Sequence, residues 1–381
     1  MRLIDRYLLR GFLFWLVVCF GAFLLLWIAF DLSFDLHRFQ TAHLRGKDII
    51  QYYFFAIPEF IPLALPVSIL LAMLYTLNNH ARHNEVTAIR AAGISLTRMC
   101  MPYFVAGFVL SVALFAFNEY FAPQAGDRAD EILRKRIDAS VKAERHLVKP
   151  LNFINYGVGG KGRAWTAALY DTEKFKMTLP FVAWESTNGE MMVLKATEGV
   201  WTNGTWVFSG DVVETLSGSA LENAGSVIRV LKTTNSLAMP EFSETPVEIQ
   251  SDIKVNAYRG INSKTHRADL PLTDIVNYLR FHPHPDRHMR NWLFTKLHGR
   301  FAGPFTCLVA IIVAIPFSAR SGRRNIFVGV AASISIFFAY FVLQQVGLTF
   351  GETGWMPSWL GAWFPNLFFG LGGLALMSKV R

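Results

Sequence analysis

The sequence predicts a membrane protein with six helical spans and an all-β domain inserted between the third span and the fourth. Its composition is 52% hydrophobic and 17% charged, whereas soluble proteins average about 25% charged residues. Long apolar segments occupy both ends of the chain, and a polar middle with turn signals separates them. Together these observations predict two membrane-embedded parts that flank a folded polar domain.

Six segments are long and apolar enough to cross a bilayer. A helix needs about 20 apolar residues to cross a hydrocarbon core about 30 Å thick. The predicted spans lie at about 11–30, 54–77, 101–121, 301–318, 326–348 and 355–377. The chain therefore divides into a first transmembrane half (1–121), a central domain (122–298) and a second transmembrane half (299–381).

The distribution of Lys and Arg predicts the orientation, because cytoplasmic loops collect these residues. With the N-terminus inside, every inside segment is basic, while the outside loop 347–354 holds no Lys or Arg. The basic residues of the inside segments are Arg2, Arg6, Arg10, Arg82, Arg90, Arg98, Arg320, Arg323, Arg324, Lys379 and Arg381. We expect both termini in the cytoplasm and the central domain outside it. The basic cytoplasmic segments then account for the net charge of +9, so no nucleic-acid partner is expected.

The central domain opens with a helical pattern, Asp127–Arg145, and then becomes β-like. Short alternating runs flank Asn188-Gly189 and Asn203-Gly204, which are typical hairpin dipeptides. Strands are predicted at 164–170, 181–185, 191–196, 200–201, 206–208, 211–216 and 226–231, and a further helix at 270–281. This pattern favours an antiparallel sandwich or open roll.

No catalytic or metal site is evident in the sequence. The segment Gly159–Gly162 lacks the hydroxyl residue that follows Lys in a nucleotide-binding loop, so we interpret it as a turn. Four residues occur at every second position, a spacing that can bind a metal from an extended strand. No second cluster of metal-binding residues is evident in the sequence, so we interpret these four as part of a polar connector. They are His282, His284, Asp286 and His288. The chain is therefore expected to be no enzyme and to need no cofactor or metal.

Glu59 is the only charged residue inside the second predicted span. A charged residue within a membrane span often has a function, and one interpretation is that Glu59 relays protons. We prefer the alternative that Glu59 reaches the interface, because it lies near the outer end of the span. Pro58, Pro62 and Pro66 in the same span are expected to kink it, since each removes a backbone hydrogen bond.

The second cytoplasmic loop, Asn78–Arg98, predicts a short helix along the membrane surface. Asn84 can cap a helix that starts at Glu85, and Gly93 can end it in a left-handed conformation. Its small side chains would allow a partner to approach closely. A plain surface linker is the alternative interpretation.

The stretch EVTAIRAAGISLTR, residues 85–98, resembles the cytoplasmic loop of the LptF/LptG family of lipopolysaccharide export permeases. The resemblance covers most of the chain, and the order of its motifs makes it specific. The other motifs are IDRY at 4–7, Asp31 and Asp35, the prolines at 58, 62 and 66, Glu119 with Ala122-Pro123, LHGR at 297–300 with Pro304, Gln344-Gln345, and WFPN at 363–366.

This resemblance implies a permease subunit of the bacterial inner membrane with a periplasmic β-jellyroll. In this family, LptF and LptG form a heterodimer that binds two copies of the ATPase LptB. ATP is therefore used by the partner subunit. The jellyroll joins an LptC-like protein to carry lipopolysaccharide onward, and the first and fifth spans line the lipid cavity. Carried over to this chain, the helix that docks on the ATPase would present Glu85, Ala88, Arg90, Ala91 and Gly93.

Arg38, Arg45 and Lys47 are predicted at the outer mouth, where lipid phosphates would lie. Charge-assisted bonds from these residues would orient the head group. The alternative is interfacial anchoring, or pairing with Asp31, Asp35 and Asp48.

Three other functions remain as alternatives to the permease. A secondary transporter would need buried ionisable residues and usually internal repeats, but the spans offer only Glu59. A membrane scaffold or sensor would bind a ligand through the β domain. A metallohydrolase would use the residues at 282–288.

Overall fold

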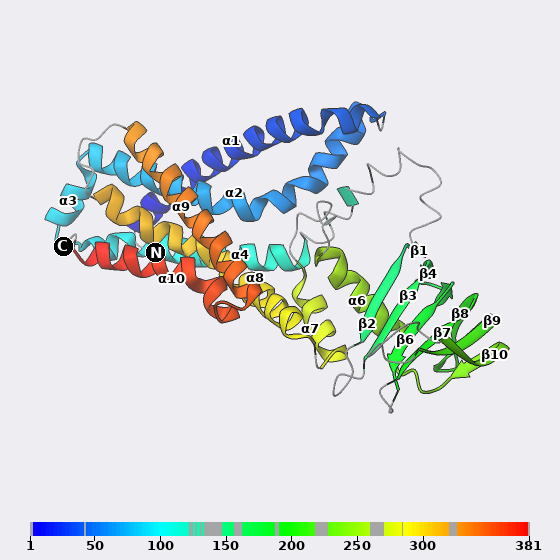
Figure 1. Cartoon of the computed structure of the whole chain (residues 1–381). Helices are drawn as coiled ribbons and strands as arrows, with labels where there is room; N and C mark the ends of the chain where they lie inside the picture. Colours follow the sequence, from blue (N-terminus) through cyan, green and yellow to red (C-terminus); the bar gives the residue numbers. More distant parts are fainter. Residues whose placement is uncertain are drawn as a thin grey trace. The chain divides into compact units, whose positions relative to one another are not determined.

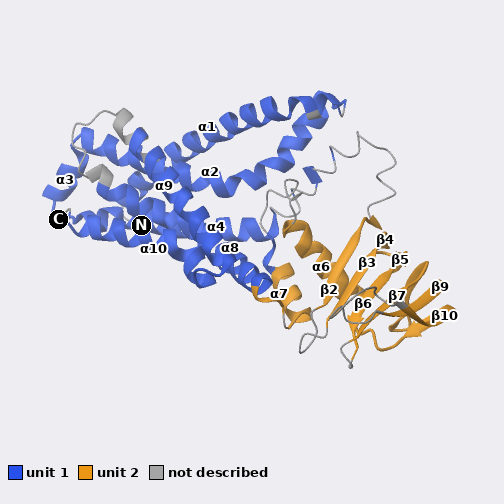
Figure 2. Ribbon diagram, in the orientation of Figure 1, with its two compact units in different colours: residues 1–137, 266–272, 288–381 blue, residues 138–265, 273–287 orange. Residues whose placement is uncertain are grey.

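A computed structural model gives the fold of the chain (Figure 1). It describes residues 3–41, 43–121, 125, 128, 129, 132, 147–155, 162–186, 190–217, 228–259, 270–283, 285–319 and 326–379. The chain divides into two compact units, which Figure 2 distinguishes by colour. Unit 1 comprises residues 1–137, 266–272 and 288–381, and unit 2 comprises residues 138–265 and 273–287.

Unit 1 contains six described helices that are long and apolar enough to cross a membrane, as predicted. They are α1 (Leu3–Thr41), α2 (Gly46–Arg82), α4 (Leu96–Tyr120), α8 (Arg287–Ala319), α9 (Ile326–Thr353) and α10 (Ser358–Ser378). The helices extend past the predicted apolar segments because backbone hydrogen bonding continues into their polar flanks. The 39 residues of α1 correspond to a length of about 58 Å.

Between α2 and α4 lies the short helix α3 (Glu85–Ala91), where the sequence predicts a surface helix. Asn84 precedes it with a φ of 59°, and its side chain makes no capping bond. Gly93 has a φ of 81°, the left-handed conformation predicted for it. Ser95 caps α4, since its hydroxyl accepts from the Arg98 amide at 3.3 Å. Gly93 therefore behaves as predicted, while the side-chain cap expected of Asn84 is not formed.

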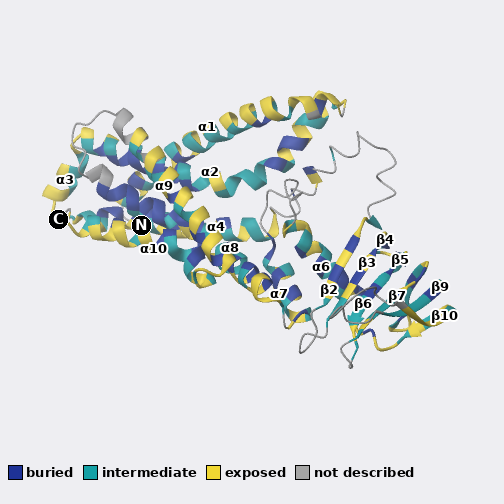
Figure 3. Ribbon diagram, viewed as in Figure 1, coloured by how far each residue is buried: buried dark blue, intermediate teal, exposed yellow. Residues whose placement is uncertain are grey.

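The core of unit 1 forms where α1, α2, α4 and α8 pack together. Phe12, Met73, Tyr103 and Ile311, one from each helix, are fully buried. Figure 3 shows this buried interior in dark blue and the exposed outward faces in yellow. The outward faces still carry large apolar side chains, which suits contact with lipid. Examples are Phe14, Val17, Leu25, Val109, Phe338 and Leu371.

Helices α9 and α10 approach closely through glycines. A Cβ atom added to Gly361 on α10 would lie 2.5 Å from the carbonyl oxygen of Gly347 and 3.0 Å from the Cα of Gly351, both on α9. No side chain fits in that space, so glycine is required for this helix pair.

Unit 2 is an antiparallel sheet, as predicted. Its strands follow the order β1-β4-β5-β8-β9-β7-β6-β3-β2, and β10 pairs with β9. The strands are β1 (Leu147–Val148), β2 (Leu151–Asn155), β3 (Arg163–Ala167), β4 (Leu169–Asp171), β5 (Lys176–Thr178), β6 (Phe181–Glu185), β7 (Met191–Lys195), β8 (Glu198–Thr202), β9 (Thr205–Ser217) and β10 (Ile228–Met239). Because β9 pairs with β8 through its first half and with β7 through its second, the sheet curls toward a jellyroll-like form.

Both predicted hairpins are present in the sheet. Asn203 and Gly204 have φ values of 51° and 80° and join β8 to β9, as a two-residue turn with two positive φ angles requires. Strands β6 and β7 pair in register around the other turn, while Asn188 and Gly189 themselves lie outside the described residues. The predicted helix Asp127–Arg145 also falls almost entirely outside them.

Two helices of the central region follow the last strand in sequence. They are α6 (Pro246–Arg259) and α7 (Leu272–Phe281), and α7 confirms the helix predicted at 270–281. Thr245 and Glu248 form a capping box at the start of α6, with Pro246 at its first position. The hydrophobic core of unit 2 includes Ile249 of α6 beside Trp165 and Trp206 of the sheet.

A cluster of titratable groups is buried between α6 and α7 in unit 2. Burial raises the pKa of the Glu248 carboxyl to about 7 and that of the Asp252 carboxyl to about 7. Burial lowers the pKa of the His282 imidazole, whose Nε2 lies 3.8 Å from Glu248 Oε1. The Tyr278 hydroxyl donates to Asp252 Oδ1 at 3.3 Å, and this hydrogen bond offsets part of the rise in the Asp252 pKa.

These shifts predict that unit 2 loses stability as the pH rises. Folded Glu248 and Asp252 hold protons up to about pH 7, whereas the unfolded chain releases them near 4.5 and 3.8. Their contribution is therefore fully present below the unfolded values and is lost as the pH rises through 7. The lowered pKa of His282 has the opposite effect, because it makes unit 2 more stable as the pH rises. That effect operates only below the ordinary pKa of histidine, 6.5. We expect a lower thermal midpoint at pH 7.5 than at pH 5.5, measured by tryptophan fluorescence.

Asp252→Asn should flatten this pH dependence, because an amide does not titrate. The matched control is Asp211→Asn, since Asp211 is exposed and already has a positive φ that asparagine tolerates. Equal pH dependence in both variants would show that Asp252 is not the group responsible.

Candidate functional site

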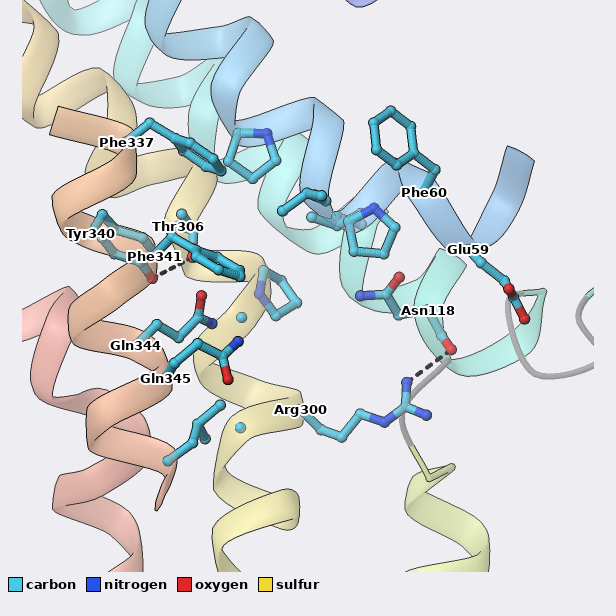
Figure 4. A pocket seen from close by; sticks show the side chains of 18 of the residues that line it. Glu59, Phe60, Asn118, Arg300, Thr306, Phe337, Tyr340, Phe341, Gln344 and Gln345 are labelled. Atoms are coloured by element: carbon cyan, nitrogen blue, oxygen red, sulfur yellow. Dashed lines mark hydrogen bonds between the residues drawn. The ribbon is translucent and has the colours of Figure 1, made fainter. Parts of the chain in front are cut away.

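A cavity of about 590 Å³ opens among α1, α2, α4, α8 and α9 of unit 1 (Figure 4). Its walls combine a large apolar surface with several polar groups. The apolar residues are Trp27, Phe60, Pro62, Leu63, Pro66, Leu114, Pro304, Phe337, Phe341 and Leu348. The polar residues are Asp31, Glu59, Asn118, Lys296, Arg300, Thr306, Tyr340, Gln344 and Gln345. A molecule with both apolar and polar parts matches such a lining.

Arg300 fixes a positive charge at the cavity wall. Its Nε donates to the Leu270 carbonyl at 2.8 Å, and its Nη1 donates to the Asn118 carbonyl at 3.0 Å. Figure 4 shows the guanidinium reaching from α8 to the end of α4. Lys296, one turn earlier on α8, pairs with Glu352 at 3.1 Å. Both cations are thus held by the protein itself.

A buried hydrogen-bond chain joins α8, α9 and α10 beside the cavity. The hydroxyls of Thr306 and Tyr340 lie 2.6 Å apart, and Tyr340 donates to Asn366 Oδ1 at 2.8 Å. Asn366 Nδ2 in turn donates to the Ala302 carbonyl at 2.7 Å. Because each polar group in this chain is satisfied internally, the chain fixes the positions of Tyr340 and α9 at the wall.

The acidic residues of the wall come from α1 and α2. The Tyr53 hydroxyl of α2 donates to Asp31 Oδ2 of α1 at 3.3 Å, which ties the two helices together. Glu59, predicted to reach the interface, lines the same cavity as Asp31 and Arg300.

In the loop between α2 and α4 of unit 1, α3 and the residues just after it carry small and basic side chains. Ala88, Arg90, Ala91 and Gly93 are all exposed. Glu85, the fifth predicted member of the set, is only half-exposed. Four of the five predicted residues are therefore accessible to a partner, and their role in docking stays a prediction.

Six spans, an inserted antiparallel β domain and a short helix after the second span are all present. The chain matches the family described as lipopolysaccharide export system permease LptF/LptG over residues 6–379. It belongs to this family. A comparison with curated proteins found no match.

Membership in the LptF/LptG family makes this chain a multi-pass permease of lipopolysaccharide export in the inner membrane. The fold agrees with the resemblance noted in the sequence. As the resemblance implies, the first and fifth spans, α1 and α9, both contribute to the cavity wall, through Trp27 and Asp31 and through Tyr340 and Gln344.

The three basic residues predicted to meet the lipid head group lie at the α1–α2 tip. The Arg45 amide donates to Asp48 Oδ2 at 3.0 Å at the start of α2, and Lys47 follows within its first turn. Neither is among the described residues that line the cavity. Arg38 lies on α1, but its side chain is outside the described part of the structure.

The residues at 282–288 do not assemble a metal site in the described part of the chain. His282 is buried and stacks on Tyr278 with ring centroids 4.2 Å apart. Asp286 and His288 are placed on the connector and the first turn of α8, and His284 lies outside the described residues. The buried position of His282 differs from the polar loop expected for it, and the absence of a metal stays a prediction.

The sequence singled out Glu59 as a charge within a span, but it did not indicate the cations of the cavity wall. Arg300, Gln344 and Gln345 belonged to motifs of the family resemblance, yet nothing local indicated that they face one cavity. Lys296 carried no signal at all. Their convergence depends on helix packing between residues far apart in the chain.

Proposed function

We propose that this chain is a permease subunit of an ATP-driven transporter that extracts lipopolysaccharide from the inner membrane. The cavity among α1, α2, α4, α8 and α9 supports this proposal most directly. Acyl chains leaving the bilayer cost about 25 cal/mol per Å² if they meet water. Apolar walls would receive them, while the polar groups of the same cavity would face the phosphorylated head.

In this proposal the energy comes from a separate LptB-type ATPase dimer in the cytoplasm. The chain would pair with the other LptF/LptG permease, and its β domain would pass lipid to an LptC-like protein in the periplasm. The basic inside segments support cytoplasmic termini and a periplasmic unit 2. The exposed face of α3 would dock on the ATPase, because its small side chains permit close contact.

Ala91→Trp on α3 tests the docking. We expect about a tenfold loss of ATPase recovered with the purified chain, because an added indole overpacks a close interface. The matched control is Ala113→Trp on α4, which is also exposed but lies within a span. Recovery of equal amounts of ATPase with both variants would contradict docking through α3.

A further inference from the structure

Lys296 and Glu352 form an ion pair at one end of the cavity. Lys296 Nζ lies 3.1 Å from Glu352 Oε1. Lys296 lines the cavity from α8, and its ammonium also lies 5.9 Å from the centroid of the Trp292 ring. Glu352 lies on α9 and is not among the described residues that line the cavity. The pair therefore joins a cation of the cavity wall to a carboxylate beyond the lining residues.

Helical spacing places the two residues of this pair at the same end of the cavity. Along α9, the lining residues include Tyr340, Gln344 and Leu348, which follow one another at intervals of four residues. Residues four apart lie on the same face of a helix, and Glu352 is the next in this series. Glu352 thus extends the lining face of α9 by one turn, and there it meets Lys296, the first described lining residue of α8.

Close packing holds α8 and α9 together beside the ion pair. A Cβ atom added to Gly351 would lie 2.9 Å from Thr295 Oγ1, so the two helices are in contact at the residues next to the pair. The side chains of Lys296 and Glu352 are 26% and 27% exposed. Ion pairs that water can reach contribute little to stability. The pair can therefore open by rotation of its side chains while the helices stay in contact.

A phosphate group is a stronger partner for Lys296 than the Glu352 carboxylate is. A phosphate monoester carries a charge of about −1.5 to −2 at pH 7 and three acceptor oxygens, whereas a carboxylate carries a single negative charge. Lysine binds phosphate as a point charge on a flexible stem. Arg300 is less exposed, and its guanidinium donates to two backbone carbonyls. Lys296 is therefore the lining cation better able to exchange its partner.

We propose that Lys296 binds a phosphate of the lipid head group, and that Glu352 is a built-in competitor that lowers the affinity of this site. This inference rests on the proposed function and deepens it by naming a phosphate site and the group that controls it. The Glu352 carboxylate leaves Lys296 when a phosphate arrives and returns when the phosphate departs. A transport site must bind tightly enough to load and weakly enough to release, and the competing carboxylate favours release.

Glu352→Gln tests the competition because it removes the charge and keeps the size of the side chain. The full complex with the ATPase and the second permease is titrated in detergent with lipid A, the phosphorylated anchor of lipopolysaccharide. A second titration uses lipid A from which the phosphates have been removed. We expect the variant to bind phosphorylated lipid A about fivefold more tightly, the strength of one partly exposed ion pair, mainly through slower dissociation. Dephosphorylated lipid A should bind equally to both proteins.

A double variant shows whether the effect passes through Lys296. Lys296→Gln should weaken the binding of phosphorylated lipid A, and adding Glu352→Gln to it should then change nothing. A gain in affinity that persisted without Lys296 would overturn the competition. The matched control is Glu198→Gln, which removes the carboxylate of the exposed Lys176–Glu198 pair in unit 2 and should leave binding unchanged. Equal gains in Glu198→Gln and Glu352→Gln would also overturn the inference, because net charge alone would explain them.

Inorganic phosphate distinguishes a lipid head group from a free anion as the occupant. It offers no acyl chains to the apolar walls, so it should not displace lipid A at equal concentration. Displacement under those conditions would overturn the assignment to a lipid head group.

The remaining outcomes separate this inference from the proposed function. Unchanged affinity for phosphorylated lipid A in Glu352→Gln, or an equal gain for both forms of lipid A, would overturn the inference while the permease function stood. A wild-type complex that bound neither form of lipid A would instead refute the proposed function.

Discussion

Replacing Gly361 with alanine is expected to force α10 away from α9 and to destabilise the second transmembrane half. The new Cβ would lie 2.5 Å from the Gly347 carbonyl oxygen and 3.0 Å from the Gly351 Cα. Both neighbours are backbone atoms, which cannot move aside as a flexible side chain can. Overpacking of this kind costs about 1–3 kcal/mol, so we expect a lower thermal midpoint for the purified chain in detergent.

The same substitution should also disturb the cavity. The Tyr340–Asn366 hydrogen bond of 2.8 Å joins the same two helices, and Tyr340 lines the cavity. Separating α9 from α10 would lengthen this bond and release the Tyr340 side chain. Lipid release should therefore fall together with stability.

Gly372→Ala is the matched control, because Gly372 also lies in α10 but has no heavy atom within 4 Å of an added Cβ. It should melt at or slightly above the wild-type temperature, since alanine favours a helix more than glycine does. If both variants melted equally, close glycine packing would not be what holds the pair together.

The spans could be predicted from the sequence because their signal is one-dimensional. A run of about 20 apolar residues is required by bilayer thickness whatever the helix packs against. The ends of helices carry no such requirement, so the predicted first span covered 11–30 while α1 covers Leu3–Thr41. Hydropathy therefore identifies the residues that cross the membrane, whereas backbone hydrogen bonding determines where each helix begins and ends.

The strands were predicted less completely because several are too short to show a pattern. β1 has two residues, and β4 and β5 have three each. The predicted strand 164–170 is in fact two strands, since β3 pairs with β2 and β6 whereas β4 pairs with β1 and β5. Which strands pair with each other depends on the tertiary fold, so the local alternation of apolar and polar residues does not predict where one strand ends and the next begins.

Other features were missed although a signal was present. Leu151-Asn152-Phe153 alternates apolar and polar residues, and β2 buries Leu151 and Phe153 on one face. Thr245-Pro246-Val247-Glu248 is a capping box with proline at the first helical position, and it opens α6. The hydrogen bond from the Tyr7 hydroxyl to Glu85 had no such signal, because the two residues lie 78 positions apart.

Arg163→Ala is expected to destabilise unit 2 strongly. Glu244 is fully buried, and Arg163 Nη1 lies 2.8 Å from its Oε2. Asn155 Nδ2 donates to the other oxygen at 3.2 Å, and the Arg163 guanidinium lies 5.0 Å from the centroid of the Phe242 ring. Removing the arginine leaves a buried carboxylate without its cation, which costs about 3–5 kcal/mol. Hydrogen exchange of β3 and β9 peptides in the full chain should report this loss.

Two comparisons identify the buried charge as the cause. Lys176→Ala removes one member of an exposed pair, Lys176–Glu198 at 2.7 Å, and exposed pairs are worth about 0–1 kcal/mol. The double variant Arg163→Met with Glu244→Leu removes both buried charges, and apolar replacement of a buried pair is often neutral. We therefore expect slow exchange to return in the double variant. If the double variant exchanged as fast as Arg163→Ala, lost packing rather than the unpaired carboxylate would explain the destabilisation. If Lys176→Ala accelerated exchange as much as Arg163→Ala, burial of the ion pair would not explain the destabilisation.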